Sequence, residues 1–177
     1  SNILVTGADG YIGKHLIKML NDIESYNIFT LDIKGDVNFN IDIRDGLEVM
    51  RVGRYLDFDA IIHLAALVRM NESVKSPSKY YETNIMGTIN LLKYIHTKNF
   101  VFASTGGAEN PTNPYGLSKL AAEDIVRQFA SKNSTIFRFY NVTGTDGFPP
   151  TNPDGLLFNL INAIKKGRPV IGCVITD

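Results

Sequence analysis

The sequence has little of three features that mark particular classes of protein. A single cysteine, Cys173, excludes an internal disulfide framework or a thiolate metal cluster within one chain and is typical of a reducing compartment. Eighteen basic and eighteen acidic residues leave no net charge, which argues against nucleic-acid and anionic membrane partners. No apolar run approaches the ~18 residues of a membrane span. We therefore expect a soluble, cytoplasmic protein with no nucleic acid, membrane or metal to bind.

The apolar residues occur in short runs separated by helical patterns. The 177 residues, 44% of them hydrophobic, suffice for one sizeable core but not for two ordinary domains. Runs at 3–5, 28–32, 39–41, 60–65, 100–104 and 136–139 predict strands in a βαβ series. Because these runs are almost continuously apolar, we predict an α/β fold, with a mostly parallel, doubly wound sheet covered by helices on both faces.

Two predicted helices are marked in the sequence, one by a start signal with an apolar stripe and the other by a wide apolar face. Ser76 and Pro77 predict the N-cap and first position of a helix whose apolar stripe is Tyr81, Ile85, Ile89 and Leu92. A second helix, at about 115–130, has a wide apolar face that either a second subunit or a wide core would bury. After it, the composition predicts a long loop at 141–155, a helix near 156–166 and a strand at 169–175.

Three glycines follow the first predicted strand at intervals of three residues. Gly7 would permit a sharp turn, Gly10 a close approach of a pyrophosphate, and Gly13 close packing of a helix on the strand. The spacing alone also fits three ordinary turn glycines. Asp32, at the end of the second strand, favours the first interpretation because it can accept hydrogen bonds from both adenosine-ribose hydroxyls. It would repel a 2′-phosphate, so the pattern predicts NAD rather than NADP, a preference that nearby Lys34 would soften.

Tyr115 and Lys119 lie four residues apart at the start of a predicted helix, so their side chains share one face. The ammonium would favour the phenolate and bring the pKa of Tyr115 toward neutral pH, although such a pair alone is common. The strand at 100–104 ends in hydroxyls, at the edge of the sheet where ligands bind in α/β folds. Thr105, or failing that Ser104, could hydrogen-bond a substrate hydroxyl beside the phenol. His63, in an apolar strand, is interpreted as a core or cofactor-lining side chain.

With the glycine motif at 7–13, Asp32 and the tyrosine–lysine motif at 115–119, the sequence resembles the extended short-chain dehydrogenase/reductase family. Within it, the segments at 71–88, 138–144 and 159–160 resemble the nucleotide-sugar epimerases of the UDP-glucose and UDP-galactose type. The resemblance implies a Rossmann-type fold that binds NAD through Gly7, Gly10, Tyr11, Ile12, Gly13, Asp32, Ile33, Asp42, Ile43, Leu64, Ala65, Ala66, Asn84, Tyr115, Lys119 and Tyr140. It also implies that Thr105, Asn141, Asn159 and Leu160 bind the substrate.

The resemblance implies an isomerase that epimerises a nucleotide sugar through a 4-keto intermediate. Tyr115 would remove the proton of the sugar 4-hydroxyl, Lys119 would hold the nicotinamide ribose, and Thr105 would polarise the hydroxyl. NAD would take the hydride and return it to the other face of the sugar. Gly106 and Gly107 stand where 4,6-dehydratases carry an Asp-Glu pair, which argues against dehydration. A homodimer through the helices near 77–97 and 115–130 is also implied.

The chain departs from this family in two places. Tyr115 follows Thr105 by only ten positions, so Thr105 could lie differently from its family counterpart. The family's C-terminal substrate domain is largely absent, so we expect 1–177 to be an NAD-binding domain in which 141–177 lead into a missing or truncated substrate-binding part. Two other functions therefore stay open: a non-catalytic NAD-binding module, and a related NAD-dependent dehydrogenase of another substrate.

Overall fold

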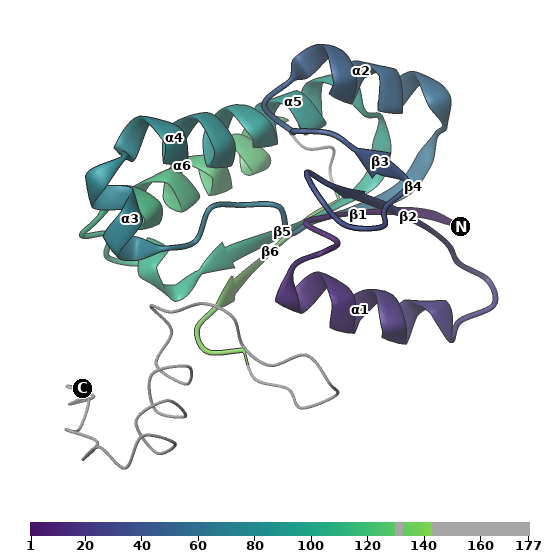
Figure 1. Ribbon diagram of the computed structural model, residues 1–177, viewed down its shortest axis with the longest axis horizontal. Helices are drawn as coiled ribbons and strands as arrows, with labels where there is room; N and C mark the ends of the chain where they lie inside the picture. Colours follow the sequence, from purple (N-terminus) through teal and green to yellow (C-terminus); the bar gives the residue numbers. More distant parts are fainter. Residues whose placement is uncertain (130–132, 143–177) are drawn as a thin grey trace.

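The computed structural model describes residues 1–129 and 133–142, which contain a six-stranded sheet (Figure 1). The strands are β1 (Asn2–Thr6), β2 (Asn27–Asp32), β3 (Phe39–Asn40), β4 (Phe58–His63), β5 (Thr97–Thr105) and β6 (Ser134–Phe139). All neighbours pair in parallel, in the order β3-β2-β1-β4-β5-β6. The chain therefore starts in the middle of the sheet and winds outward first to one edge and then to the other. This arrangement confirms the predicted Rossmann-type α/β fold.

Helices cover both faces of the sheet (Figure 1). One face carries α1 (Tyr11–Asn21), and the other carries α2 (Gly46–Tyr55), α4 (Pro77–Tyr81), α5 (Gly87–Tyr94) and α6 (Pro114–Phe129). The short helix α3 (Met70–Lys75) leads into α4, and a π-helical turn at Glu82–Met86 joins α4 to α5. A 3₁₀ turn at Gly106–Ala108 follows β5.

The predicted strands within the described residues are all present, with small differences at their ends; β5, for example, begins at Thr97. The helix α2 was not predicted. Its start is nevertheless marked in the sequence, because the Asp45 carboxylate accepts hydrogen bonds from the backbone N–H groups of Leu47 (3.0 Å) and Glu48 (3.2 Å). An acidic residue followed three positions later by Glu is a common N-terminal capping pattern.

The predicted buried stripe of the helical run 77–94 was wrong. Pro77 begins the run as predicted, but the Ser76 side chain makes no capping hydrogen bond. The buried positions are Tyr80, Asn84, Gly87, Thr88 and Leu91, whereas the predicted positions are only partly buried or, at Tyr81, exposed. The polar Asn84 and Thr88 can face the interior because both have hydrogen-bond partners there.

The hydrophobic core lies between the sheet and the helices α2, α5 and α6. It includes Leu4, Ile61 and Phe100 from neighbouring strands, and Val49, Leu91 and Val126 from the three helices. Burial of these side chains fixes the helices on the sheet and so holds the carboxyl ends of the strands in place along one edge.

Among the residues that the structure describes, no helix is both long and apolar enough to span a bilayer. The loop predicted to begin at 141 lies outside the described residues from 143 onward, as do the helix predicted near 156–166 and the strand predicted at 169–175. The same is true of Asn159, Leu160 and Cys173.

Candidate active site

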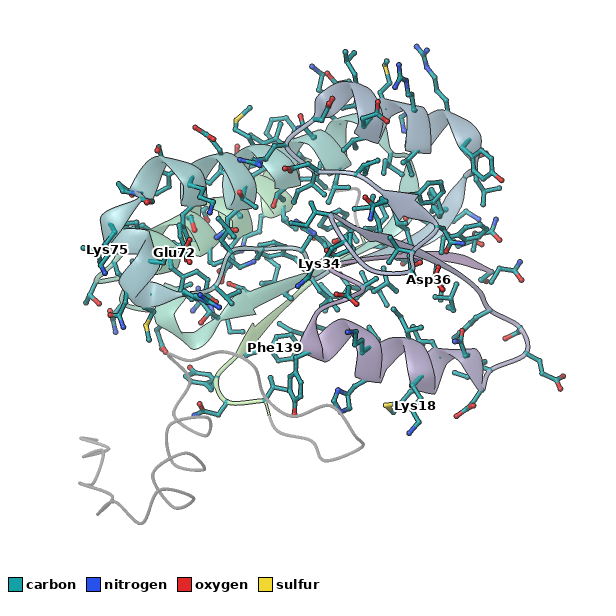
Figure 2. All side chains as sticks on the ribbon, in the orientation of Figure 1. Lys18, Lys34, Asp36, Glu72, Lys75 and Phe139 are labelled. Carbon is teal, nitrogen blue, oxygen red and sulfur yellow. The ribbon has the colours of Figure 1, made fainter. Side chains whose placement is uncertain are left out.

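A cleft of about 590 Å³ opens at the carboxyl edge of the sheet. Figure 2 shows two of its lining residues, Lys34 and Phe139, at this edge, whereas Lys18 lies on the outer side of α1. Most of the predicted site residues line this one cleft: Gly7, Gly10, Tyr11, Ile12, Gly13, Asp32, Ile33, Asp42, Ile43, Leu64, Ala65, Ala66, Thr105, Tyr115, Lys119, Tyr140 and Asn141. Of the predicted site residues that the structure describes, only Asn84 lies away from it.

The glycine turn between β1 and α1 forms one wall of the cleft. Gly7 has a positive φ of +72°, and a Cβ there would come within 2.6 Å of the Ala65 backbone nitrogen. A Cβ on Gly13 would lie 2.3 Å from the Gly7 carbonyl oxygen. A Cβ on Gly10 would meet only that same oxygen, at 3.0 Å, and otherwise open space. Gly7 and Gly13 are therefore required by the turn itself, whereas Gly10 leaves room for a ligand at the start of α1.

Asp32 lies at the end of β2, beside the glycine turn. Its carboxylate accepts hydrogen bonds from the backbone N–H groups of Asp9 (3.0 Å) and Ile33 (2.7 Å). A carboxylate has about four acceptor sites, so acceptor capacity remains for a ligand. Lys34 also lines the cleft, and its ammonium lies 3.9 Å from the Asp9 carboxylate, which pairs more closely with Lys14 at 2.9 Å.

The opposite end of the cleft contains the predicted catalytic residues. Burial raises the pKa of Tyr115, and a hydrogen bond from the Thr105 side chain opposes this increase. Thr105 therefore lies beside the phenol despite the short connection between them. Ser104 is buried and its hydroxyl donates to Glu123, which leaves Thr105 as the hydroxyl available at the cleft.

Lys119 is almost completely buried, and its ammonium lies 4.1 Å from the centre of the Phe102 ring. Burial lowers its pKa to about 7, although the charge of Glu123 acts in the opposite direction. This finding corrects the expectation that Lys119 brings the pKa of Tyr115 down. In the free protein, Lys119 carries its charge only part of the time at neutral pH, and burial dominates at the phenol.

Asn84, predicted to bind the cofactor, is buried behind the cleft wall. Its amide oxygen accepts from the backbone N–H of Leu67 (2.8 Å), and its amide nitrogen donates to the Leu67 carbonyl (2.9 Å) and to the Ser118 hydroxyl (2.9 Å). Ser118 in turn donates to the carbonyl of Tyr115 (2.7 Å). Asn84 thus joins the loop after β4 to the start of α6.

Of the two interpretations of His63, a core side chain or a cofactor-lining one, the structure supports the first. The Thr88 hydroxyl donates to the Asn84 carbonyl at 2.7 Å, so it accepts from His63 Nε2 at 3.0 Å. His63 Nδ1 then accepts from the Thr6 hydroxyl at 2.7 Å, which itself accepts from the Ala65 N–H. Both ring nitrogens are satisfied in the neutral ring, and burial holds the pKa of His63 well below its usual value.

Two polar contacts at the cleft were not predicted. Arg44 donates to both carboxylate oxygens of Asp42, which lowers the pKa of that carboxyl. The Tyr140 hydroxyl donates to the Glu109 carboxylate at 3.1 Å, and this hydrogen bond raises the pKa of Tyr140. The Tyr140 ring lies so close to Gly106 that a Cβ there would come within 2.3 Å of it.

The residues missed by the sequence interpretation also include Glu123 and Arg138, which form a two-point ion pair at 2.8 Å behind Lys119. Their positions offered a partial signal. Glu123 follows Lys119 by one helical turn, and Arg138 lies one residue before the cleft residue Phe139. The pair itself joins residues 15 positions apart, so it becomes visible only once α6 is packed against β6.

A parallel sheet that reverses its order beside a glycine turn, with an acidic residue at the end of the next strand, defines a Rossmann-type dinucleotide-binding class. The sequence profile of the NAD dependent epimerase/dehydratase family matches residues 3–175. The chain therefore belongs to this family, whose cofactor is NAD.

Several relatives are UDP-glucose 4-epimerases. The enzyme of Caenorhabditis elegans is 32% identical over 217 residues, covering 93% of this chain and 61% of its own. That of Oryza sativa subsp. japonica, UDP-glucose 4-epimerase 2, is 30% identical over 207 residues, covering 93% and 50%. The structure of the Thermotoga maritima UDP-glucose 4-epimerase with UDP-glucose superposes with a TM-score of 0.80 at 28% identity, covering 96% of this chain and 65% of that one.

The Thermus thermophilus UDP-glucose 4-epimerase in complex with NAD superposes with a TM-score of 0.79 at 28% identity, covering 96% of this chain and 64% of that one. The chain thus spans between half and about two thirds of the length of these relatives.

Proposed function

We propose that this chain supplies the NAD-binding and catalytic part of a nucleotide-sugar 4-epimerase acting on UDP-glucose and UDP-galactose. The observation that carries the proposal is the meeting of Thr105, Tyr115 and Lys119 at one end of a cleft whose other end holds the glycine turn and Asp32. The similarity to UDP-glucose 4-epimerases over most of the chain supports the choice of substrate.

The cleft fits NAD on its own chemistry. The open space beside Gly10 lies at the start of α1, where free backbone N–H groups favour a phosphate. Asp32 has acceptor capacity for ribose hydroxyls, and Asp42 and Ile43 line the wall where the resemblance places adenine. We assign the nicotinamide ribose to Lys119. When bound, NAD supplies a hydride acceptor and donor for C4 of the sugar.

The side chains of the protein would manage the proton. Tyr115 would remove the proton of the sugar 4-hydroxyl. It would return the proton to the same oxygen after the 4-keto sugar has rotated to present its other face. Thr105, already beside the phenol, would hydrogen-bond the same sugar oxygen. A charged Lys119 near the phenol would favour the phenolate. A bound ligand whose oxygens accept hydrogen bonds from Lys119 would favour that charged form and so lower the pKa of Tyr115.

The two glycines after Thr105 support epimerisation over dehydration. The resemblance places the acidic pair of 4,6-dehydratases at positions 106 and 107, directly after Thr105. A Cβ at 106 would lie 2.3 Å from the Tyr140 ring, so this exposed side chain would have to move. A Cβ at 107 would make only ordinary contacts with Thr105, so dehydration is disfavoured by the missing acidic side chains and not by packing.

Replacement of Tyr115 by Phe tests the proposal. With NAD and UDP-glucose, proton NMR of the anomeric signals should show conversion to UDP-galactose by the wild type and none by Tyr115→Phe. The affinity for NAD, measured by calorimetry, should change less than about twofold, because the phenol hydroxyl is one contact among many. Tyr55→Phe is the matched control, since Tyr55 is 71% exposed on α2, away from the cleft.

The alternatives give different results. A dehydrogenase of another substrate would accumulate NADH in proportion to turnover, whereas an epimerase regenerates NAD. Binding of NAD without conversion of any UDP-sugar would contradict catalysis by this chain alone and would favour a non-catalytic NAD-binding module. Unchanged conversion by Tyr115→Phe would remove this residue from the mechanism.

We also propose that residues 1–177 form one NAD-binding domain and that Asn141, Asn159 and Leu160 are substrate-binding residues.

We further propose that the chain forms a homodimer. Apolar side chains remain exposed on α4, the π turn and α6, among them Tyr81, Met86, Leu117 and Phe129. A second copy would bury them. Light scattering at micromolar concentration should give twice the chain mass, and a monomer would contradict this part of the proposal.

A further inference from the structure

A buried carboxylate lies one helical turn beyond Lys119 and does not line the cleft. Glu123 is 0% exposed and Lys119 is 3% exposed, and their spacing places them on one face of α6. Burial of an ionised carboxylate is unfavourable unless charged or hydrogen-bonding partners compensate for it. The partners of Glu123 therefore indicate its role.

Two donors reach each oxygen of this carboxylate. Oε1 accepts from the Ser104 hydroxyl (2.5 Å) and from Nε of Arg138 (2.8 Å). Oε2 accepts from Nη2 of Arg138 and from Nη2 of Arg127, both at 2.8 Å. Burial raises the pKa of Glu123, but these hydrogen bonds outweigh it and bring the pKa to about 2. Glu123 is therefore ionised at neutral pH, with its acceptor sites filled.

The donors come from the same strands that end at the cleft. Ser104 directly precedes Thr105 at the end of β5, and Arg138 directly precedes the cleft residue Phe139 at the end of β6. Glu123 itself belongs to α6, which carries Lys119. One carboxylate thus joins the ends of two strands to the catalytic helix.

Lys119 also experiences the charge of Glu123. The groups that face Lys119 are the Phe102 ring on β5, His63 on β4, and Tyr115 and Glu123 on α6. His63 is neutral, because burial and the Lys119 charge both disfavour its protonated form. Tyr115 keeps its proton in the free protein, since burial raises its pKa. Among these groups, Glu123 is the one that carries a negative charge.

We propose that Glu123 is a positioning residue for the reaction, whose carboxylate holds Lys119 and Thr105 in a fixed relation to one another at the cleft. The proposal rests on the function proposed above. Its consequence is electrostatic as well as steric, because the same carboxylate favours the charged form of Lys119.

The titration of Lys119 provides the test, followed by NMR of protein labelled with ¹³C and ¹⁵N at lysine and assigned with Lys119→Met. Glu123→Gln should lower the apparent pKa of Lys119 by about one pH unit, because a nearby opposite charge is lost. Arg138→Gln should raise it, because Glu123 keeps its charge and loses its main neutralising partner. Both variants lose hydrogen bonds of the Glu123 carboxylate. If Glu123 had only a structural role, both variants would be less stable, but the pKa of Lys119 would not shift in opposite directions in the two.

Asp124→Asn is the matched control. It removes one negative charge from the next position of α6, where Asp124 is 61% exposed, and it should leave the Lys119 titration unchanged. If Glu123→Gln does not fold, the Lys119 pKa in Arg138→Gln tests the role of Glu123 by itself: a rise supports the proposal and no change contradicts it. Identical Lys119 titrations in the wild type and every folded variant would overturn the proposal.

Calorimetry with NAD separates this proposal from the proposed function. We expect Glu123→Gln to weaken NAD binding about tenfold and Asp124→Asn to leave it unchanged. A wild type that does not bind NAD would overturn the proposed function, while the Lys119 titration would still decide the role of Glu123. NAD binding that is equally tight in Glu123→Gln would contradict the positioning role.

Discussion

The glycine turn gives opposite predictions for two neighbouring glycine-to-alanine substitutions. In Gly13→Ala, the new Cβ would lie 2.3 Å from the Gly7 carbonyl oxygen and 2.8 Å from that of Ala8. Both contacts are with backbone atoms, and the turn is held by a 2.9 Å hydrogen bond from Gly7 N–H to the Leu31 carbonyl. Relief would require the turn to move by about 1 Å, so we expect a cost of about 3 kcal/mol.

Helix propensity offsets part of this cost, because alanine is favoured over glycine within a helix by about 1 kcal/mol. The net loss in the free energy of unfolding should be about 2 kcal/mol. In Gly10→Ala, φ is −73° and the only close atom is the Gly7 oxygen at 3.0 Å, so stability should change by less than about 1 kcal/mol. The methyl group would instead occupy the space proposed for the pyrophosphate.

Urea unfolding followed by circular dichroism and calorimetry with NAD measure the two effects. With a slope of about 2 kcal/mol per molar urea, Gly13→Ala should unfold at about 1 M lower urea than the wild type. Gly10→Ala should unfold near the wild-type midpoint and bind NAD at least about tenfold more weakly, a difference of about 1.4 kcal/mol. Wild-type NAD affinity in Gly10→Ala would refute the assignment of the turn, and an unchanged midpoint in Gly13→Ala would refute the packing argument.

Three further predictions concern charge. Asp32→Ser should shift the ratio of NAD to NADP affinity at least about tenfold toward NADP, measured by calorimetry, because the repulsion of a 2′-phosphate is removed while Lys34 remains. His63 has a lowered pKa, so below about pH 6.5 the unfolded chain binds a proton that the folded one excludes. The free energy of unfolding should therefore fall as the pH decreases below that point, by up to about 1.4 kcal/mol per pH unit. Urea titrations of His63→Gln should show a correspondingly smaller fall over the same pH range. For Lys119, with a pKa of about 7, the unfolded chain binds the extra proton between about pH 7 and 10.5. Stability should rise with pH over that window, and Lys119→Met should flatten the rise.

The strands and the cleft were accessible from the sequence because both depend on local patterns. Continuous apolar runs marked all six strands, and the glycine spacing with Asp32 located the carboxyl edge of the sheet at the correct end. The resemblance to the epimerases added Asp42 and the segment at 64–66, which the structure also places on the cleft.

What the sequence did not reveal depends on contacts between distant segments. Apolar character pointed to Tyr81 for the buried face of α4, whereas the structure buries Tyr80, whose hydroxyl accepts from the Arg69 N–H at 3.1 Å. The pKa of Tyr115 could not be derived from its spacing to Lys119, because the burial of both side chains reverses the simple expectation. Glu123 was not singled out, because its partner Arg138 lies 15 residues away in the chain and meets it only in the folded structure.

The strand order has a consequence for how the cleft comes into existence during folding. Strand β1 pairs with β2 on one side and, through Ile3 and Ala60, with β4 on the other, so the middle of the sheet closes only when residues far apart in the chain meet. The cleft needs more still, because one end is built from residues 7–13 and 31–34 and the other from residues 103–142. A ligand that spans the cleft therefore binds only the completed sheet and stabilises it by mass action. The supply of cofactor then becomes a determinant of how many copies of the chain persist in the folded state.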